Sequence, residues 1–403
     1  MADTESLEDL EIVEDDAELS VDSLPTGASD RAIEQFFERG RLRVVQDRND
    51  FFLPHVLDFI EGRKWGNLQP EYQRRLRWDQ KKKSKLIESF IMNVPVPPVF
   101  LYETVLGRFE VMDGQQRLNS IVEYMQNRFK LTGLRTWAVL NGRIFSDLPP
   151  SIRRGLERAK ISAITLMSDT SDSKGNSLDL RAQVFERLNT GGERLNPQEL
   201  RNSLHSGPFN QMLIELSRQP AFTNAWNIPN HEENTRTDGS PADSLKNNIL
   251  FKRMTDVEIV LRFFAFKEPE SIAGSVRAML DNTMKRYQTA DEETLEKLKS
   301  EFCDALDLCV RVFGDNVFRI PAKASTRESR LSRPYFDAQM VIMHQLRQER
   351  DALLANSREI EVGVRRLAEP DSQTYELLVG RANTSVAVKE RIEAVGAVIR
   401  EII

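Results

Sequence analysis

A strand that turns through glycine directly into a helix is the feature that most constrains the fold of this 403-residue chain. Residues Arg108–Met112 alternate and are rich in β-forming types, which predicts a strand. After Asp113 and Gly114, apolar side chains recur at the spacing of an amphipathic helix, at Leu118, Ile121, Val122 and Met125. Glycine tolerates the backbone conformations that such a turn needs. The helix start would leave backbone N–H groups pointing outward at the positive end of the helix dipole, which favours a bound phosphate.

Two interpretations of this turn stay open on local spacing alone. Asp113 is a preferred N-cap type and Gln116 stands three positions later, which is the arrangement of a capping box. In the other interpretation, Gln115, Gln116 and Arg117 donate hydrogen bonds to an anion at the helix start, with the planar guanidinium as the strongest donor. A cap does not require two amides and an arginine in one turn, so the choice depends on the rest of the sequence.

Length and composition set the broad class of the protein. The chain is 40% hydrophobic and 29% charged, and it has no apolar run long enough to span a bilayer. Its start is acidic and lacks the basic and apolar regions of a secretory signal. Cys303 and Cys309 are expected to be buried or half-buried thiols in a reducing compartment. These observations predict a cytoplasmic protein without membrane contact, organised as two domains and a tail.

Charge is distributed unevenly along the chain. Residues 1–30 contain eleven acidic residues and no lysine or arginine, which predicts a disordered tail. The remaining residues carry a net charge of +5. Nine basic residues lie between Arg63 and Lys85, against only two acidic ones. This cluster is either a solvated face or a surface that meets a polyanion such as DNA.

Periodicity divides the folded part in two. Residues 31–208 mix strand and helix signals, whereas residues 209–403 have helical periodicity and little strand signal. Besides the strand and helix above, the first part is expected to contain strands over Val96–Tyr102 and Ile161–Met167. Three further helices are expected. One covers Phe51–Glu61, one begins after Asp79 as its N-cap, and one begins after Asn196 as its N-cap, with Pro197 in the first turn. The sequence therefore predicts an α+β fold, a small mixed sheet with helices followed by an all-helical domain.

Three polar segments lie at junctions between the expected elements, where function is usually found. They are Tyr72-Gln73-Arg74, Asp113–Arg117 and Asn189-Thr190-Gly191-Gly192. Each offers amide or guanidinium donors, or a glycine-rich turn whose N–H groups suit phosphate. The first is otherwise an exposed basic loop, and the third a plain helix stop. The sequence contains no Walker phosphate-binding motif, no nucleophile elbow and no histidines at metal-ligand spacing.

Together these segments resemble the N-terminal domain of the GmrSD-type restriction endonucleases, a family with a ParB/sulfiredoxin-like fold. The resemblance covers roughly residues 55–208, a little under half of the chain. It rests on Pro70-Glu71-Tyr72-Gln73-Arg74, Lys85–Ser89, Pro95–Pro98, Val111–Leu118, Phe185–Gly192 and Leu195–Arg201. In this family the Asp-Gly-Gln-Gln-Arg motif is associated with binding and hydrolysis of nucleoside triphosphates, in defence against foreign or modified DNA.

The resemblance implies a role for each segment. Asp113, Gln116 and Arg117 would be catalytic, with Asp113 orienting the motif or a metal-bound water. The nucleotide-binding residues would be Tyr72, Gln73, Arg74, Gly114, Gln115, Asn189, Thr190, Gly191 and Gly192. Mg²⁺ would accompany the triphosphate, without a metal site built from protein side chains alone. The DNA-binding residues would be Arg75, Arg77, Lys81, Lys82 and Lys83.

One departure from the family pattern limits this expectation. Many members carry a C-terminal His-Asn-His nuclease domain, and the helical half of this chain shows no such motif. The expected function is therefore that of a nucleotide-hydrolysing component of a restriction-type system, with any DNA cleavage assigned to a nuclease partner protein or to a site without a recognised motif. Two alternatives remain, a DNA-binding adaptor that does not turn over nucleotide and a ParB-like DNA nickase.

Overall fold

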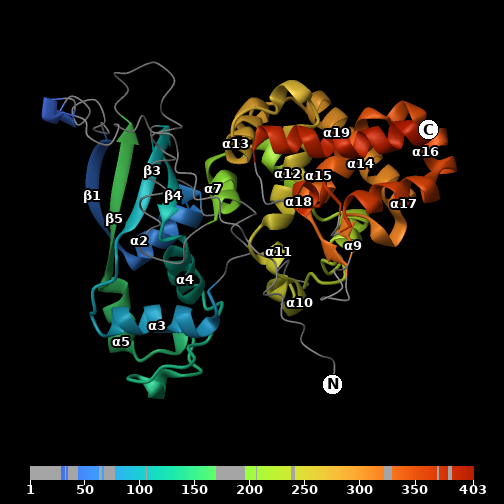
Figure 1. The fold of residues 1–403 in the computed structure, drawn as a ribbon. Coiled ribbons are helices and arrows are strands. Elements are labelled where there is room, and N and C mark those ends of the chain that lie inside the picture. Colours follow the sequence, from blue (N-terminus) through green and yellow to red (C-terminus); the bar gives the residue numbers. More distant parts are fainter. Residues whose placement is uncertain are drawn as a thin grey trace.

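The computed structural model describes most of the chain after the acidic segment. The described residues are 29–31, 33–34, 44–62, 66–67, 78–105, 107–168, 196–205, 207–236, 241–321, 329–369, 372–379 and 384–403. Figure 1 shows a sheet with its helices beside a part built from helices. The prediction of a disordered tail over residues 1–30 falls outside the described residues except for the last two.

The sheet is mixed and has five strands. Their spatial order is β1 (Val44–Phe52), β5 (Lys160–Ser168), β3 (Val99–Val105), β4 (Arg108–Asp113) and β2 (Gly66–Asn67). β5 runs antiparallel to β1 and parallel to β3, while β3 and β4 form an antiparallel pair and β2 lies parallel to β4. The expected small mixed sheet is thereby confirmed, and each of the three predicted strands is present.

The prediction of a helix over Phe51–Glu61 is wrong at its start. Phe51 and Phe52 are the last residues of β1, and helix α2 covers only Leu53–Leu57, with Pro54 in its first turn, before a π-helical turn over Asp58–Gly62. β1 has an exposed, mostly polar middle without apolar alternation, so no local pattern indicates a strand. It forms because every one of its residues pairs with β5, more than one hundred residues away in the sequence.

Both faces of the sheet are covered by helices. Successive side chains of a strand point to opposite faces, so neighbouring residues of one strand pack in different cores. On one face Val99 and Leu101 pack in a core with α2, α3 (Gln80–Ile91), α4 (Gln115–Met125) and α5 (Pro150–Arg158). On the other face, Leu200 and Leu204 of helix α7 (Pro197–Leu204) pack against side chains of β3, β4 and β5. These strand side chains are Phe100, Tyr102, Met112, Ile164 and Leu166.

The remaining described residues form the expected helical part around one large core. Its α-helices are α8 (Pro208–Leu216), α9 (Pro220–Ala225), α10 (Asp243–Asn247), α11 (Ile249–Lys252), α12 (Thr255–Phe266), α13 (Val276–Tyr287), α14 (Glu292–Phe313), α15 (Arg333–Gln345), α16 (Arg350–Ala355), α17 (Ser357–Leu367), α18 (Tyr375–Val379) and α19 (Ser385–Ile402). The strand content is one pair of two-residue strands, β6 (Arg319–Ile320) and β7 (Arg330–Leu331). The α+β fold class with a helical C-terminal part is confirmed.

Two smaller expectations concern the helical part and the membrane. Both cysteines have free thiols, with Cys303 half-buried and Cys309 buried, and burial raises the pKa of the Cys309 thiol well above its ordinary value. Among the helices of the described ranges, none is both long and apolar enough to cross a bilayer.

Candidate functional site

The turn at Asp113 differs from the predicted capping box. Asp113 is the last residue of β4 and pairs with Phe100 of β3, so its backbone belongs to the sheet. The N-cap of α4 is Gly114, in the left-handed conformation at φ 95° and ψ 9°, and no side chain caps the helix. The capping-box interpretation is therefore wrong, because the strand extends one residue further than the periodicity indicated.

Gly114 is required by space as well as by backbone conformation. A Cβ atom at this position would lie 2.4 Å from Cγ1 and 2.9 Å from Cβ of Val99. Val99 is buried at the start of β3, with 1% of its surface exposed, so it has little room to move. The start of α4 thus lies directly against the sheet, which fixes the direction of its first N–H groups.

The guanidinium group of Arg117 is engaged within the turn itself. Its Nη2 lies 2.5 Å from Oδ2 of Asp113, and its Nη1 donates to the carbonyl oxygens of Pro97 at 2.7 Å and Pro98 at 3.2 Å. The Arg117 side chain is 12% exposed and that of Asp113 is 35% exposed. Arg117 therefore joins the end of β4 to the segment that leads into β3.

Gln116 connects the turn to the segment before α3. Its Oε1 accepts a hydrogen bond of 3.0 Å from the backbone N–H of Trp78. Trp78 directly follows a stretch that lies outside the described residues and contains the predicted Tyr72, Gln73, Arg74, Arg75 and Arg77. Trp78 itself therefore lies at the turn. The predicted Asn189, Thr190, Gly191 and Gly192 also fall outside the described residues.

Helix α7, which follows the third polar segment, begins as predicted. The Asn196 side chain accepts from the backbone N–H groups of Gln198 and Glu199, and the Glu199 carboxylate accepts from the Asn196 N–H at 2.7 Å. This is a complete capping box, with Pro197 in the first turn. The Asn196 amide also donates to the carbonyl oxygen of Arg253 at 2.6 Å, which ties the helix start to the helical part.

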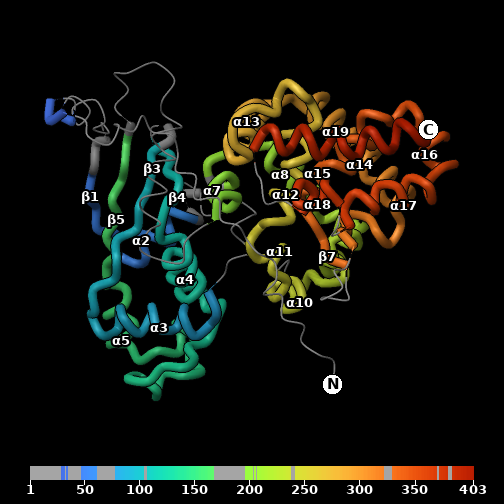
Figure 2. Tube along the Cα trace, in the orientation of Figure 1, coloured from blue at the N-terminus to red at the C-terminus, as the bar shows by residue number. Residues whose placement is uncertain are grey.

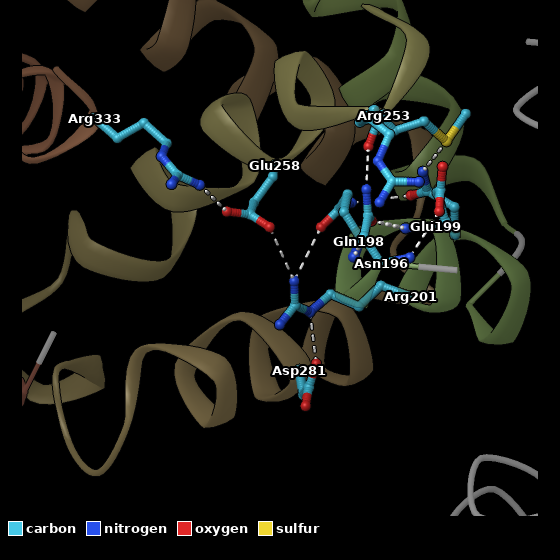
Figure 3. Close-up of polar contacts among 10 residues, drawn as sticks. Asn196, Gln198, Glu199, Arg201, Arg253, Glu258, Asp281 and Arg333 are labelled. Carbon is cyan, nitrogen blue, oxygen red and sulfur yellow. Dashed lines mark hydrogen bonds and ion pairs between the residues drawn. The ribbon is translucent and has the colours of Figure 1, made fainter. Parts of the chain in front are cut away.

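Arg201 of α7 is the centre of a buried ionic network (Figure 3). Its Nε lies 2.6 Å from Oδ1 of Asp281, and its Nη1 lies 3.2 Å from Oε1 of Gln198 and 3.5 Å from Oε2 of Glu258. Glu258 also accepts from Arg333 at 3.1 Å. Burial alone would raise the pKa of Glu258, but the charges of Arg333 and Arg201 hold it below its ordinary value.

Helix α7 therefore contacts both parts of the protein. Its leucines lie on the sheet, while Gln198, Arg201 and Asn202 are buried toward α12 and α13. Figures 1 and 2 show it between the sheet and the helices that follow. The sequence predicts the cap of this helix but not the Arg201 network, because the carboxylates that pair with Arg201 lie 57 and 80 positions further along the chain. The division of domains at residue 208 stays a prediction.

The basic helix α3 presents only some of its lysines to solvent. Asp79 caps the helix as predicted, by accepting from the backbone N–H of Lys82 at 2.7 Å. Lys81 and Lys82 are exposed. Lys83 is half-buried, with Nζ 2.5 Å from the Glu123 carboxylate of α4 and 5.7 Å from the centre of the Phe129 ring. Lys83 thus packs α3 against α4, and Lys81 and Lys82 are the solvent-facing cations among the described members of the predicted set.

One family model matches part of the chain. Residues 56–206 match the family model described as the GmrSD restriction endonuclease N-terminal domain, which confirms the resemblance. Among solved structures, the chain matches a Pnob8-like ParB-N domain with 10% identity and a TM-score of 0.24, over 88% of this chain and 99% of that one. A TM-score this low does not establish a common fold, so the fold class rests on the strands and helices described above. No curated protein matches the chain.

Proposed function

We propose that this chain, through its GmrSD-type domain at residues 56–206, is a nucleoside-triphosphate-binding and hydrolysing component of a restriction-type defence system that acts on foreign or modified DNA. The observation that carries the proposal is the β4–Gly114–α4 turn inside the matched segment. Its glycine N-cap leaves the start of the helix without a side-chain cap, in a position fixed against the sheet. Helix starts of this kind favour anions through their N–H groups and dipole.

The side chains around this turn suit a polyphosphate. Gln115, Gln116 and Arg117 supply amide and guanidinium donors within the first turn of α4, and Asp113 supplies one partly exposed carboxylate. In the proposal Asp113, Gln116 and Arg117 form the catalytic set, and Gly114 and Gln115 bind phosphate. The segments around Gln73 and Asn189, which lie outside the described residues, are proposed to complete the pocket.

Mg²⁺ fits the donor set at this turn. Protein-bound Mg²⁺ commonly takes one or two carboxylates together with substrate phosphates and retained waters, and Asp113 is the carboxylate that the turn offers. When bound, the ion would neutralise charge on the phosphates. The contacts of Arg117 would then orient Asp113, because the guanidinium already binds one oxygen of that carboxylate.

Hydrolysis is tested with a panel of the four common nucleoside triphosphates, with and without duplex DNA. We expect phosphate release by the wild type and a decrease of roughly tenfold or more for Arg117→Ala, since removing one donor at a developing phosphate charge usually has an effect of at least this size. Arg236→Ala is the matched control, because Arg236 forms an exposed ion pair with Asp243 in the helical part. Wild-type protein that is folded and releases no phosphate from any of the four would refute hydrolysis.

DNA binding is tested at the exposed lysines of α3. We expect the double substitution Lys81→Glu and Lys82→Glu to weaken duplex binding and to reduce the slope of log affinity against log salt by about 0.9 for every DNA phosphate that the protein no longer neutralises. Lys389→Glu, at an exposed lysine of α19, should leave the slope unchanged. Fluorescence anisotropy over a salt series measures both quantities. Identical slopes in all three proteins would remove α3 from the interface.

A non-catalytic DNA-binding adaptor is the second candidate function. The observation that favours it is the engagement of Arg117 with Asp113 and with the carbonyl oxygens of Pro97 and Pro98, which gives this arginine a structural role. This candidate predicts salt-dependent DNA binding that persists in Arg117→Ala, together with no phosphate release by the wild type.

A further inference from the structure

The loop over residues 131–143, at the end of the sheet domain near α3, carries an unusually exposed apolar side chain. Val139 is 73% exposed, more than any other large hydrophobic residue in the described part of the chain. It lies in a single 3₁₀ turn, Ala138–Leu140. In Figure 1 this end of the molecule lies at the bottom of the view, next to α3 and α5. An isolated exposed valine needs no explanation by itself.

The exposure of Val139 is not a consequence of a loosely built loop. The two ends of the loop are joined by backbone hydrogen bonds from Leu131 N to Arg143 O at 3.0 Å and from Gly142 N to Leu131 O at 2.7 Å. The Asn141 side chain bonds both the N–H and the carbonyl oxygen of Leu134. The flanking leucines Leu131, Leu134 and Leu140 are buried in the core of the sheet domain. The fold thus presents Val139 on a rigid support.

Helix α3 positions the first half of the loop. Its residues Gln80, Ser84 and Glu88 are spaced four apart and therefore lie on one face of the helix. Gln80 donates to the carbonyl oxygen of Lys130, the Ser84 hydroxyl accepts from the backbone N–H of Thr132, and the Glu88 carboxylate accepts from the N–H groups of residues 136 and 137. Residues 130–137 therefore lie along α3, beside its exposed lysines.

The loop, together with the three residues before it, is also strongly basic. Residues 128–143 contain four basic side chains and no acidic one. All four, which are Arg128, Lys130, Arg135 and Arg143, are exposed. Arg135 and Arg143 stand four residues before and four residues after Val139. An apolar tip between two cations, next to the lysines of α3, is complementary to a polyanion that also offers apolar contacts.

We propose that this loop enters a groove of duplex DNA, with Val139 against the base edges. Arg135 and Arg143 would then contact the phosphates of the two DNA strands that border the groove. The proposal rests on the proposed action on DNA and extends its interface from α3 to the loop. Phosphate contacts position a protein on DNA, whereas apolar side chains that reach the bases respond to sequence and to the ease of deformation. An anionic membrane is the weaker partner, because one valine buries little apolar surface.

Opposite charges at Val139 test the proposal. We expect Val139→Glu to weaken binding of a short mixed-sequence duplex roughly tenfold, and Val139→Lys to leave binding equal or stronger, because within the groove the phosphates on either side would repel a carboxylate and attract an ammonium group. Val386→Glu and Val386→Lys are matched controls, because Val386 is 60% exposed on α19 in the helical part. These controls should bind as the wild type does. Arg135→Gln and Arg143→Gln should each reduce the salt slope by about one.

The outcomes separate this proposal from the one on which it rests. Wild-type binding that is equally strong in Val139→Glu and Val139→Lys, with unchanged salt slopes for the two arginine variants, overturns the loop and leaves the action on DNA intact. A wild type that binds no duplex at any salt concentration overturns both. Binding to vesicles of phosphatidylserine and phosphatidylcholine that depends on Val139, without binding to DNA, overturns the choice of partner. Thermal melting of each variant confirms that it is folded.

Discussion

Replacing Arg201 with alanine is expected to lower the free energy of unfolding by about 3–5 kcal/mol. Arg201 is 4% exposed and its guanidinium lies between the carboxylates of Asp281 and Glu258. Removing it takes the contacting cation away from Asp281 and leaves the largely buried Glu258 with Arg333 alone. The loss is therefore governed by the uncompensated charges rather than by the missing packing.

Urea denaturation followed by circular dichroism measures this effect. Arg236→Ala is the control, because Arg236 is 48% exposed and its partner Asp243 is 76% exposed. An exposed ion pair contributes little, so this variant should lose less than about 1 kcal/mol. Arg201→Lys should fall between the two, since a lysine keeps the charge but cannot bind Asp281 and Glu258 at the same time with a planar fork. Equal losses in Arg201→Ala and Arg236→Ala would contradict the network.

The pH dependence of the Arg201 effect follows from Glu258. In the folded protein the pKa of Glu258 is lower than its ordinary value of 4.5, so the unfolded chain takes up its proton first as the pH falls. The stability from this carboxylate is therefore present above pH 4.5 and is lost below it. Since Arg201 supplies part of that stabilisation, the difference between wild type and Arg201→Ala should be largest near neutral pH and should decrease in acid.

The elements that the sequence predicts correctly are those with local causes. The helical periodicity over residues 209–403 corresponds to long helices such as α14, and both Asp79 and Asn196 cap helices as their spacing indicates. β1 and the contacts of Arg201 escape prediction for the same reason. Each is stabilised by partners far away in the sequence, and the residues themselves carry no periodic signal.

The candidate site shows the same division between local and non-local causes. The strand, glycine turn and helix at Asp113–Arg117 are predictable because each has its own periodicity or conformational preference. The role of Asp113 is not, because its pairing with Phe100 keeps it in the sheet and moves the N-cap to Gly114. The Pro97 and Pro98 carbonyl oxygens that accept from Arg117 are likewise brought to the turn by the β3–β4 pairing.

Gly114→Ala is expected to lower the free energy of unfolding by about 2–5 kcal/mol. Two physical effects add at this position. The backbone has φ of +95°, which a residue with a Cβ adopts at a cost of about 1–2 kcal/mol. The new Cβ would also lie 2.4 Å from Cγ1 of Val99, and overpacking of a core costs typically about 1–3 kcal/mol.

Gly142→Ala separates these two effects. Gly142 has a similar φ of +86°, but a Cβ added there would meet nothing within 4 Å. The decrease in the free energy of unfolding caused by Gly142→Ala should therefore equal the conformational cost alone. The additional decrease caused by Gly114→Ala should measure the clash with Val99. Val99→Ala in the Gly114→Ala background should recover part of that excess, which a double-mutant cycle quantifies as a favourable coupling between the two sites. If Gly114→Ala and Gly142→Ala were equally stable, the start of α4 would not lie directly against β3, and the fixed direction of its N–H groups, on which the proposed phosphate site depends, would be lost with it.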